Sequence, residues 1–311
     1  GLGRGLRGGP GGCDPRQGAS AIAGWIDYRL GVERRGILAR GEYGAFDTRR
    51  LVLAWAPERA AEGTFVGVEL RDGQGFGPNR AHFGAAALGR FEHRVDRSLS
   101  IFLLGAAQSA QFDSAGVVRR DDVESARLAC ASEAFFCTAD PNQGGSGSRY
   151  LAAVGLHWTR PLERFETTIW GGVRQLRVRE NFTGQLLDAR GDGLDERYET
   201  GTVGAGGPRR GGGGGRRGAP RGPARGGGRA HAGGGVFPAR HDVGETVTHR
   251  IRRDRGVPYA TVFDASLNVT NLGAWIGADV SPAAWLRVSG GVRADAFAFA
   301  VTDRDRPTTD R

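Results

Sequence analysis

The three cysteines are the residues whose spacing most directly suggests a chemical bond. Cys130 and Cys137 lie seven residues apart in CASEAFFC, whereas Cys13 lies near the start of the chain. No histidine and no second cysteine pair lies close to Cys130 and Cys137, so their surroundings do not favour a metal site. The pair predicts a local disulfide in a surface loop, which requires an oxidising compartment such as the periplasm or cell exterior. Two unrelated thiols are the alternative.

The sequence contains none of the compact motifs of catalysis or nucleotide binding. G-x-S-x-G, H-E-x-x-H, a P-loop and C-x-x-C are all missing. The acidic segment 188–196 (DARGDGLDE) has some likeness to a calcium loop, but it lacks the D-x-D-x-D-G spacing and the terminal bidentate glutamate. A solvated acidic loop is the simpler interpretation. The six histidines are scattered and are interpreted as lumen or loop residues: His82, His93, His157, His231, His241 and His249. We therefore predict no enzyme activity, no cofactor and no metal site.

Strand-length alternation of apolar and polar residues is the dominant pattern of the chain. It is clearest in 98–112, 149–159, 165–178 and 284–301. A strand needs about 9–11 residues to cross the hydrocarbon layer, and its side chains alternate between lipid and lumen. No run of 18 apolar residues is present, which excludes a transmembrane helix. The pattern predicts an all-β fold, an antiparallel transmembrane β-barrel meander.

The connections between the expected strands support this interpretation. Further strands are expected at 20–32, 37–46, 50–56, 81–95 and within 259–280. Long connections (57–79, 113–148 and 180–200) then alternate with short ones (95–98 and 160–163). Outer-membrane barrels have short periplasmic turns and long extracellular loops, whereas a soluble sandwich has no reason to sort its loops in this way. A soluble β protein is the alternative, but charged residues that alternate with apolar neighbours, such as Arg90, Glu92 and Arg94, argue against it.

The net charge of +9 comes almost entirely from one segment of unusual composition. Residues 204–240 contain eight arginines and no acidic residue, and the rest of the chain is nearly neutral. The segment resembles RGG-type RNA-binding sequence, but it has no aromatic residue between Tyr198 and Phe237. We expect no strand in 204–235. We interpret 204–242 as out-of-frame translation of GC-rich DNA, and we infer that the correct reading frame would encode one β-hairpin of the barrel here.

The N-terminal segment shares this composition. Residues 1–18 are rich in glycine and arginine, and they are expected to be disordered or out of frame. The chain contains no methionine and therefore no initiator, which suggests a fragment. The expected organisation is a low-complexity segment at 1–18, barrel strands over 19–203, a Gly/Arg-rich segment at 204–242, and further barrel strands over 243–311.

Several stretches resemble the barrel of TonB-dependent outer-membrane receptors. They are AIAGWIDYRLGV at 21–32, VVRRDDVESARL at 117–128, FFCTADPNQGG at 135–145, RENFTGQLLDARGDGLDERYE at 179–199 and VSGGVRADAFAFAV at 288–301. The resemblance implies a 22-stranded barrel filled by an N-terminal plug, and a TonB-box that docks the energy-coupling complex. Nine strands are readable, and about eleven with the inferred hairpin, so the chain would form about half of such a barrel. Its two open edges would not be tolerated in hydrocarbon, and the chain alone is not expected to insert.

The resemblance implies that the parent protein takes up a scarce solute, such as a metal chelate, across the bacterial outer membrane. Its expected partners are the TonB complex, acting through a plug that this chain lacks, outer-membrane lipid and an unidentified small molecule, with no nucleic acid. Ligand contacts are expected in the loops 113–148 and 180–200, without assignment to single residues. A passive porin or structural barrel is the first alternative, and a soluble RGG-type RNA-binding protein is a remote one.

Overall fold

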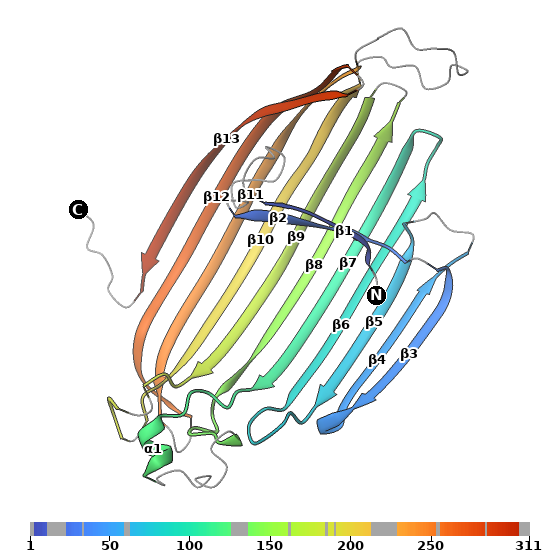
Figure 1. Cartoon of the computed structure of the whole chain (residues 1–311). Coiled ribbons are helices and arrows are strands. Elements are labelled where there is room, and N and C mark those ends of the chain that lie inside the picture. The colour runs from blue at the N-terminus through green and yellow to red at the C-terminus, as the bar shows by residue number, and fades with distance from the viewer. Residues whose placement is uncertain are drawn as a thin grey trace, which may run out of the picture.

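A computed structural model describes residues 3–10, 23–32, 34–58, 63–125, 136–160, 163–183, 186–189, 191–212, 229–252, 256–283 and 285–304. Within them the chain forms a two-stranded sheet and an 11-stranded antiparallel sheet (Figure 1). The large sheet consists of β3 (Gly36–Gly44), β4 (Thr48–Ala56), β5 (Phe65–Gly73), β6 (His82–Arg94), β7 (Leu99–Asp113), β8 (Gly144–Thr159), β9 (Glu163–Glu180), β10 (Gly193–Gly212), β11 (Arg229–Ile251), β12 (Pro258–Ala283) and β13 (Leu286–Asp303). The small sheet pairs β1 (Gly3–Pro10) with β2 (Gly24–Leu30), and a 3₁₀ turn, η1 (Ala45–Asp47), and one short helix, α1 (Arg120–Glu124), complete the elements.

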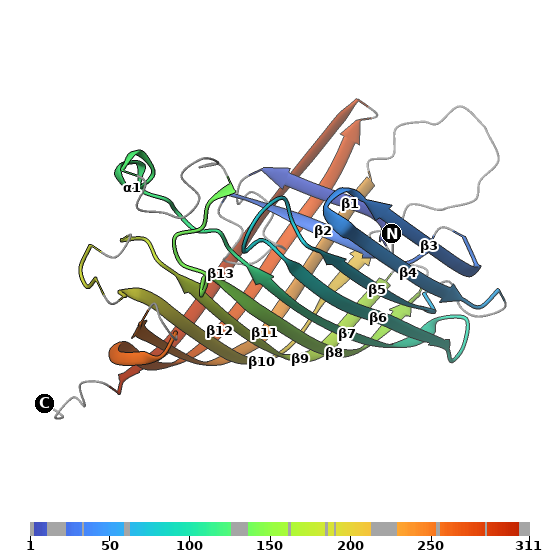
Figure 2. The same cartoon turned by 90° about the horizontal axis from the view of Figure 1, so that it is seen from below.

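Each strand of the large sheet pairs with the strands before and after it in sequence. The order runs without a crossover from β3 at one edge to β13 at the other. Seen along its length, this meander curves into a trough with a concave and a convex face (Figure 2). The prediction of an all-β antiparallel meander is confirmed. The part of the chain that the structure describes has no helix long and apolar enough to cross a membrane.

The convex face carries an apolar band. The register places Leu53 opposite Val68, and Val68 opposite Ala87, so these side chains share one face. The same face bears large apolar side chains that are exposed in this chain: Ile37, Leu51, Trp55, Val66, Leu70, Phe83, Leu103, Val154, Ile169, Val173, Leu272, Ile276 and Val292. A band of this size is costly in water, and it is typical of a surface that faces lipid.

The concave face is more polar and is partly covered by the N-terminal hairpin. Val32, which follows β2, packs with Ala56 and Phe65 in a small buried cluster on this face. Both views place the β1–β2 hairpin over the trough (Figures 1 and 2). Only one small cluster of this kind forms among the described residues, because most apolar side chains point outward.

Two expectations for the N-terminus are wrong. The segment 20–32 was expected to be the first barrel strand, but β2 pairs with β1 and not with the large sheet. Residues 1–18 were expected to be disordered or out of frame; 3–10 form β1, so disorder is wrong for that part, and out-of-frame translation stays a hypothesis. The physical reason is that a ladder uses backbone groups, so a Gly/Arg-rich segment can pair with a stronger strand despite its lack of core side chains.

The long connection predicted at 57–79 contains a strand. β5 occupies residues 65–73 and pairs with both β4 and β6. Its sequence signal is the alternation of Val66, Val68 and Leu70, which are exposed on the convex face. The glycine-rich end of the segment concealed this pattern. The predicted alternation of long and short connections therefore does not hold at this position.

The expectation of no strand in 204–235 is also wrong at both ends of that range. β10 continues to Gly212 and β11 begins at Arg229, and the two pair with each other through this part. Residues 213–228 lie outside the described residues. β9 and β12 flank this hairpin and supply ladder partners on both sides, which compensates for the poor strand propensity of glycine. Out-of-frame translation of 204–242 stays a hypothesis.

The connections fall at two rims of the sheet. The rim that bears α1 carries the connections 45–47, 74–81, 114–143, 181–192 and 252–257. The opposite rim carries 57–64, 95–98, 160–162, 213–228 and 284–285. The rim with α1 has the longest connection of the chain, and it holds both segments in which ligand contacts were predicted.

Candidate functional site

The two predicted ligand loops meet at the rim that bears α1, although they are shorter than expected. They span 114–143 and 181–192, because β8 begins at Gly144 and β10 at Gly193. The amide N–H of Asn181 donates to Oε1 of Gln143 at 3.1 Å, and Nδ2 of Asn181 donates to Oδ2 of Asp140 at 3.4 Å. All three side chains are buried. Hydrogen bonds from the backbone and side-chain amides of Asn181 to Gln143 and Asp140 thus join the two loops.

A third loop joins the same network. Nδ2 of Asn79 donates to the carbonyl of Gln143 at 3.0 Å and to the carbonyl of Ser114 at 2.5 Å. Asn79 has a positive φ of 54°, a conformation that asparagine tolerates better than most residues. Hydrogen bonds therefore join three connections at this rim into one platform of loops: 74–81, 114–143 and 181–192.

The acidic segment 188–196 has a structural role, because its groups form hydrogen bonds that hold the loop in place. Oδ2 of Asp192 accepts a hydrogen bond from the amide of Leu187 at 2.8 Å. Within the described residues, no group of three or more His, Cys, Asp and Glu side chains could hold a metal ion. The hydroxyl of Tyr259 donates to the carbonyl of Gly191 at 3.1 Å, which ties this loop to β12. The segment thus packs against the neighbouring strands of the rim.

Cys137 is disulfide-bonded and buried in the 114–143 loop. Cys130 and Cys13 lie outside the described residues, so the pairing of Cys130 with Cys137 stays a prediction. A buried disulfide in this loop would restrain it from within, while the amide network restrains its base.

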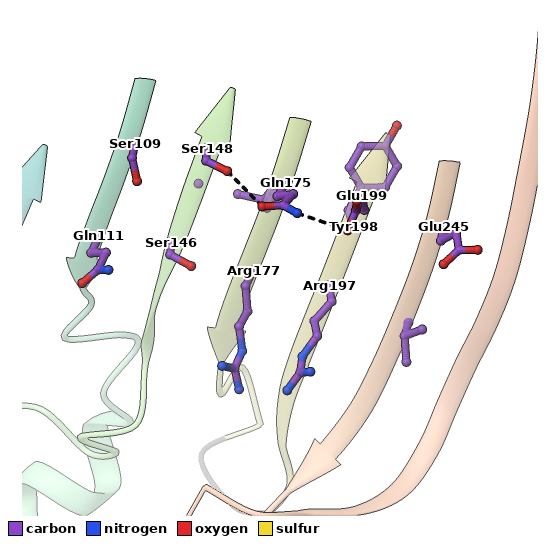
Figure 3. A pocket seen from close by; sticks show the side chains of 13 residues that line it. Ser109, Gln111, Ser146, Ser148, Gln175, Arg177, Arg197, Tyr198, Glu199 and Glu245 are labelled. Atoms are coloured by element: carbon purple, nitrogen blue, oxygen red, sulfur yellow. Dashed lines mark hydrogen bonds between the residues drawn. The ribbon is translucent and has the colours of Figure 1, made fainter. Parts of the chain in front are cut away.

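A polar patch lies on the convex face close to the same rim. Ser109 is in register with Ala85, Leu70 and Leu51, so it shares the face of the apolar band. The patch surrounds a recess of about 400 Å³, and its side chains on this face come from β7 to β11: Ser109, Gln111, Ser146, Ser148, Gln175, Arg177, Arg197, Glu199 and Glu245 (Figure 3). Tyr198, which also lines the recess, is in register with Leu176 and belongs to the opposite face. It marks the end of the apolar band on these strands.

Hydrogen bonds run across the strands of this patch. The hydroxyl of Ser148 donates to Oε1 of Gln175 at 3.1 Å, and Nε2 of Gln175 donates to Oε2 of Glu199 at 3.3 Å (Figure 3). Next to this row, the fully buried Asp195 accepts hydrogen bonds from Arg177 and Arg197. No pattern in the sequence indicated this cluster, because Arg177 meets Asp195 only through the β9–β10 register.

The concave wall carries charges that are mostly neutralised in pairs. Nη2 of Arg50 lies 2.9 Å from Oε2 of Glu69, and Nη2 of Arg90 lies 3.3 Å from Oε2 of Glu92. Arg240 with Asp242 and Arg293 with Asp295 form pairs at 2.8 and 2.6 Å. The prediction that Arg90 and Glu92 face the interior is confirmed by the register, which aligns Arg90 with the buried Phe65.

Not every arginine of this wall is paired: Arg94, which shares the face of Arg90, forms no ion pair within the described residues. Arg149 and Arg174 are two further examples. They lie directly opposite each other on β8 and β9, and both are exposed. No ion pair joins either of them to a carboxylate within the described ranges. Sequence reasoning missed this pair, since the two residues are 25 positions apart and become neighbours only through the register.

These features define a class of protein by its fold. The sheet is part of the wall of an antiparallel β-barrel of the membrane type, with an apolar outer face, a charged inner face and a platform of loops at one rim. No protein-family model matches the sequence, and no curated protein matches it. Solved structures with similar folds are named as transporters and receptors.

The similar structures are transport barrels of low sequence identity to this chain. The ferric citrate transporter FecA in its unliganded form matches with a TM-score of 0.68 at 10% identity, over 91% of this chain and 41% of FecA. The copper transporter OprC matches with a TM-score of 0.61 at 14% identity, over 96% of this chain and 43% of OprC. The ferric yersiniabactin uptake receptor FyuA from Yersinia pestis matches with a TM-score of 0.59 at 11% identity, over 96% and 45%.

The chain thus spans less than half the length of these three barrels. The resemblance to TonB-dependent receptors is confirmed at the level of the fold. At 10–14% identity the likeness to these structures concerns the fold.

Proposed function

We propose that this chain is part of the wall of a bacterial outer-membrane receptor that takes up a scarce solute, such as a metal chelate, with energy supplied by the TonB complex. The observation that carries the proposal is the division of one curved sheet into an apolar convex face and a charged concave face. The fold likeness to transporters of ferric citrate, copper and ferric yersiniabactin supports it.

The direction of the wall follows from its loops. The rim with α1 bears the 114–143 loop and the amide network around Gln143, whereas three of the connections at the opposite rim have four residues or fewer. Long loops face the cell exterior in such barrels. The platform at the α1 rim would therefore meet the solute first.

Two measurements test this function. The gene that contains this segment is expressed in a Gram-negative host, and the uptake of labelled ferric citrate, ferric yersiniabactin and copper is compared in isogenic strains with and without TonB. We expect the product in the outer-membrane fraction and uptake of at least one solute only where TonB is present. A product that fractionates with soluble proteins would refute the proposal.

A passive porin is the second candidate, because the concave wall is charged and could line an aqueous channel. It predicts solute entry that does not depend on TonB and that shows no saturation. Uptake of this kind would favour the porin over the energised receptor.

A further inference from the structure

Two arginines of the concave wall that form no ion pair within the described residues lie next to each other on neighbouring strands. Arg149 and Arg174 are directly opposite residues of β8 and β9, and side chains in this relation have Cβ atoms about 4.5–5.5 Å apart. Like charges directly opposite each other destabilise a sheet. Among the described residues, neither guanidinium has a carboxylate partner. Four other arginines of the same wall, by contrast, are paired: Arg50, Arg90, Arg240 and Arg293.

Neutral polar residues flank the arginines on both sides. Gln108 lies opposite Arg149 on β7, and Thr200 lies opposite Arg174 on β10. The four residues thus form one continuous row across β7 to β10 on the concave face. The row supplies two fixed positive charges together with an amide and a hydroxyl that can donate hydrogen bonds.

Thr200 contributes a hydroxyl whose hydrogen-bonding capacity is not used within the described part of the chain. Only 7% of this residue is exposed, and its Oγ1 atom is buried without a hydrogen-bond partner in the described structure. A buried hydroxyl without a partner is costly, and most such groups in proteins are satisfied. The unsatisfied hydroxyl lies next to the unneutralised Arg174.

The row also opens into a recess. Gln108 lines a hollow of about 220 Å³ together with Glu69, Arg71 and Gly84 of β5 and β6. Next to the arginines, Gly147 and Gly172 occupy the same face and carry no side chain. The side chains of Arg149 and Arg174 are themselves exposed on this face.

We propose that Arg149 and Arg174, assisted by Thr200 and Gln108, form a subsite for an oxyanion group of the transported solute, a carboxylate or a phosphate. Guanidinium groups bind both oxyanions through paired hydrogen bonds, and the hydroxyl of Thr200 would complete the donor set. The assignment of this subsite rests on the proposed transport function. It restricts the class of transported solute to anions.

The test uses the complete protein that contains this chain, folded in an uncharged detergent at low ionic strength. Citrate is the probe, and its neutral trimethyl ester is the matched control ligand. Binding is followed by calorimetry for the natural sequence, Arg149→Gln, Arg174→Gln and Thr200→Val. The control variant is Arg50→Gln, which removes an arginine of the same wall that is already paired with Glu69.

We expect citrate to bind and its trimethyl ester not to bind. Each arginine variant should weaken citrate binding by about 10- to 100-fold, and Thr200→Val by about 3- to 10-fold, whereas Arg50→Gln should leave it unchanged. The affinity should also fall as salt is added. Circular dichroism shows whether each variant has kept its strands.

Three results would overturn the subsite: no citrate binding by the natural sequence, equal binding of the ester, or equal losses in Arg50→Gln and the two arginine variants. Failure here is separable from failure of the transport proposal. TonB-dependent uptake without citrate binding would refute only the proposed subsite. Citrate binding without TonB-dependent uptake would remove only the energised function.

Discussion

Arg177 and Asp195 form a two-point ion pair across β9 and β10. Nε of Arg177 donates to Oδ1 of Asp195 at 2.8 Å, and Nη2 donates to Oδ2 at 2.8 Å. Arg197 adds a third hydrogen bond to Oδ2 at 3.1 Å. Asp195 has no exposed surface, whereas both arginines are partly exposed. The carboxylate thus anchors two arginines at the point where the convex wall becomes polar.

Replacement of Asp195 by asparagine should destabilise the sheet. The change leaves two arginines without their counter-charge, and we expect a loss of about 1.5–3 kcal/mol because hydrogen bonds to charged groups are lost while the arginines can still reach water. The midpoint of urea-induced unfolding in detergent measures it. Asp47→Asn is the control, since Asp47 also pairs with an arginine, Arg49 at 2.7 Å, but on an exposed turn. A control variant that lost as much stability as Asp195→Asn would contradict the role of burial.

An arginine on the convex band should be far more costly than one on the concave wall. Val68 lies in the apolar band, and Val68→Arg in the complete barrel that contains this wall should cost about 2–4 kcal/mol in lipid vesicles. Ala86→Arg is the matched control, because Ala86 is opposite Glu69 on the concave face. Folding yields and unfolding midpoints in vesicles compare the two. If both variants were equally stable, the convex face would not be the lipid surface.

The turn between β6 and β7 should loosen in acid. Backbone and side-chain hydrogen bonds from Ser98, and the amide of Leu99, lower the pKa of Asp96 below its ordinary value of 3.8. The carboxylate therefore stabilises the turn at any pH above about 3.8, and this stabilisation is lost as the pH falls through the lowered pKa. Hydrogen exchange of the Ser98 and Leu99 amides checks this. Protection of these two amides should persist to below pH 3.8 and disappear only as the pH falls through the lowered pKa of Asp96, and Asp96→Ala should abolish it at every pH.

The cysteine pairing can be settled by peptide mapping without reduction. Cleavage after arginine places Cys130 and Cys137 in the same peptide, 128–149, and Cys13 in another, 8–16. A Cys130–Cys137 disulfide would make peptide 128–149 lighter by two hydrogens. We expect that mass before reduction and the heavier mass after it. A cross-linked species of the two peptides would instead assign Cys13 as the partner of Cys137.

Much of the wall could be predicted from sequence, because alternation is a local property. The pattern in 98–112 anticipated β7 within one residue at each end, and the pattern in 284–301 anticipated β13 within two. β5 was missed because its alternation is only nine residues long and runs into glycine. The pairing of β1 with β2 could not be foreseen, since backbone pairing of a glycine-rich segment leaves no side-chain signal.

From the sequence, only the loop regions of the candidate site could be predicted, and not its individual residues. The sequence indicated two loops, and the structure brought them together through Asn181 and Gln143. The individual groups, such as Asp195 or the Arg149–Arg174 pair, depend on strand register, and a register shift of one residue would place every side chain on the other face. No single-residue pattern in the sequence fixes that register.

The edge strands β3 and β13 limit how this wall can be closed. Both run toward the rim that bears α1, because the sheet between them has an odd number of strands. Two copies of this sheet, inserted with the same orientation, would meet through parallel seams. Any polypeptide that joins β13 to β3 by antiparallel ladders alone must therefore contribute an odd number of strands, so hairpins by themselves cannot complete the ring.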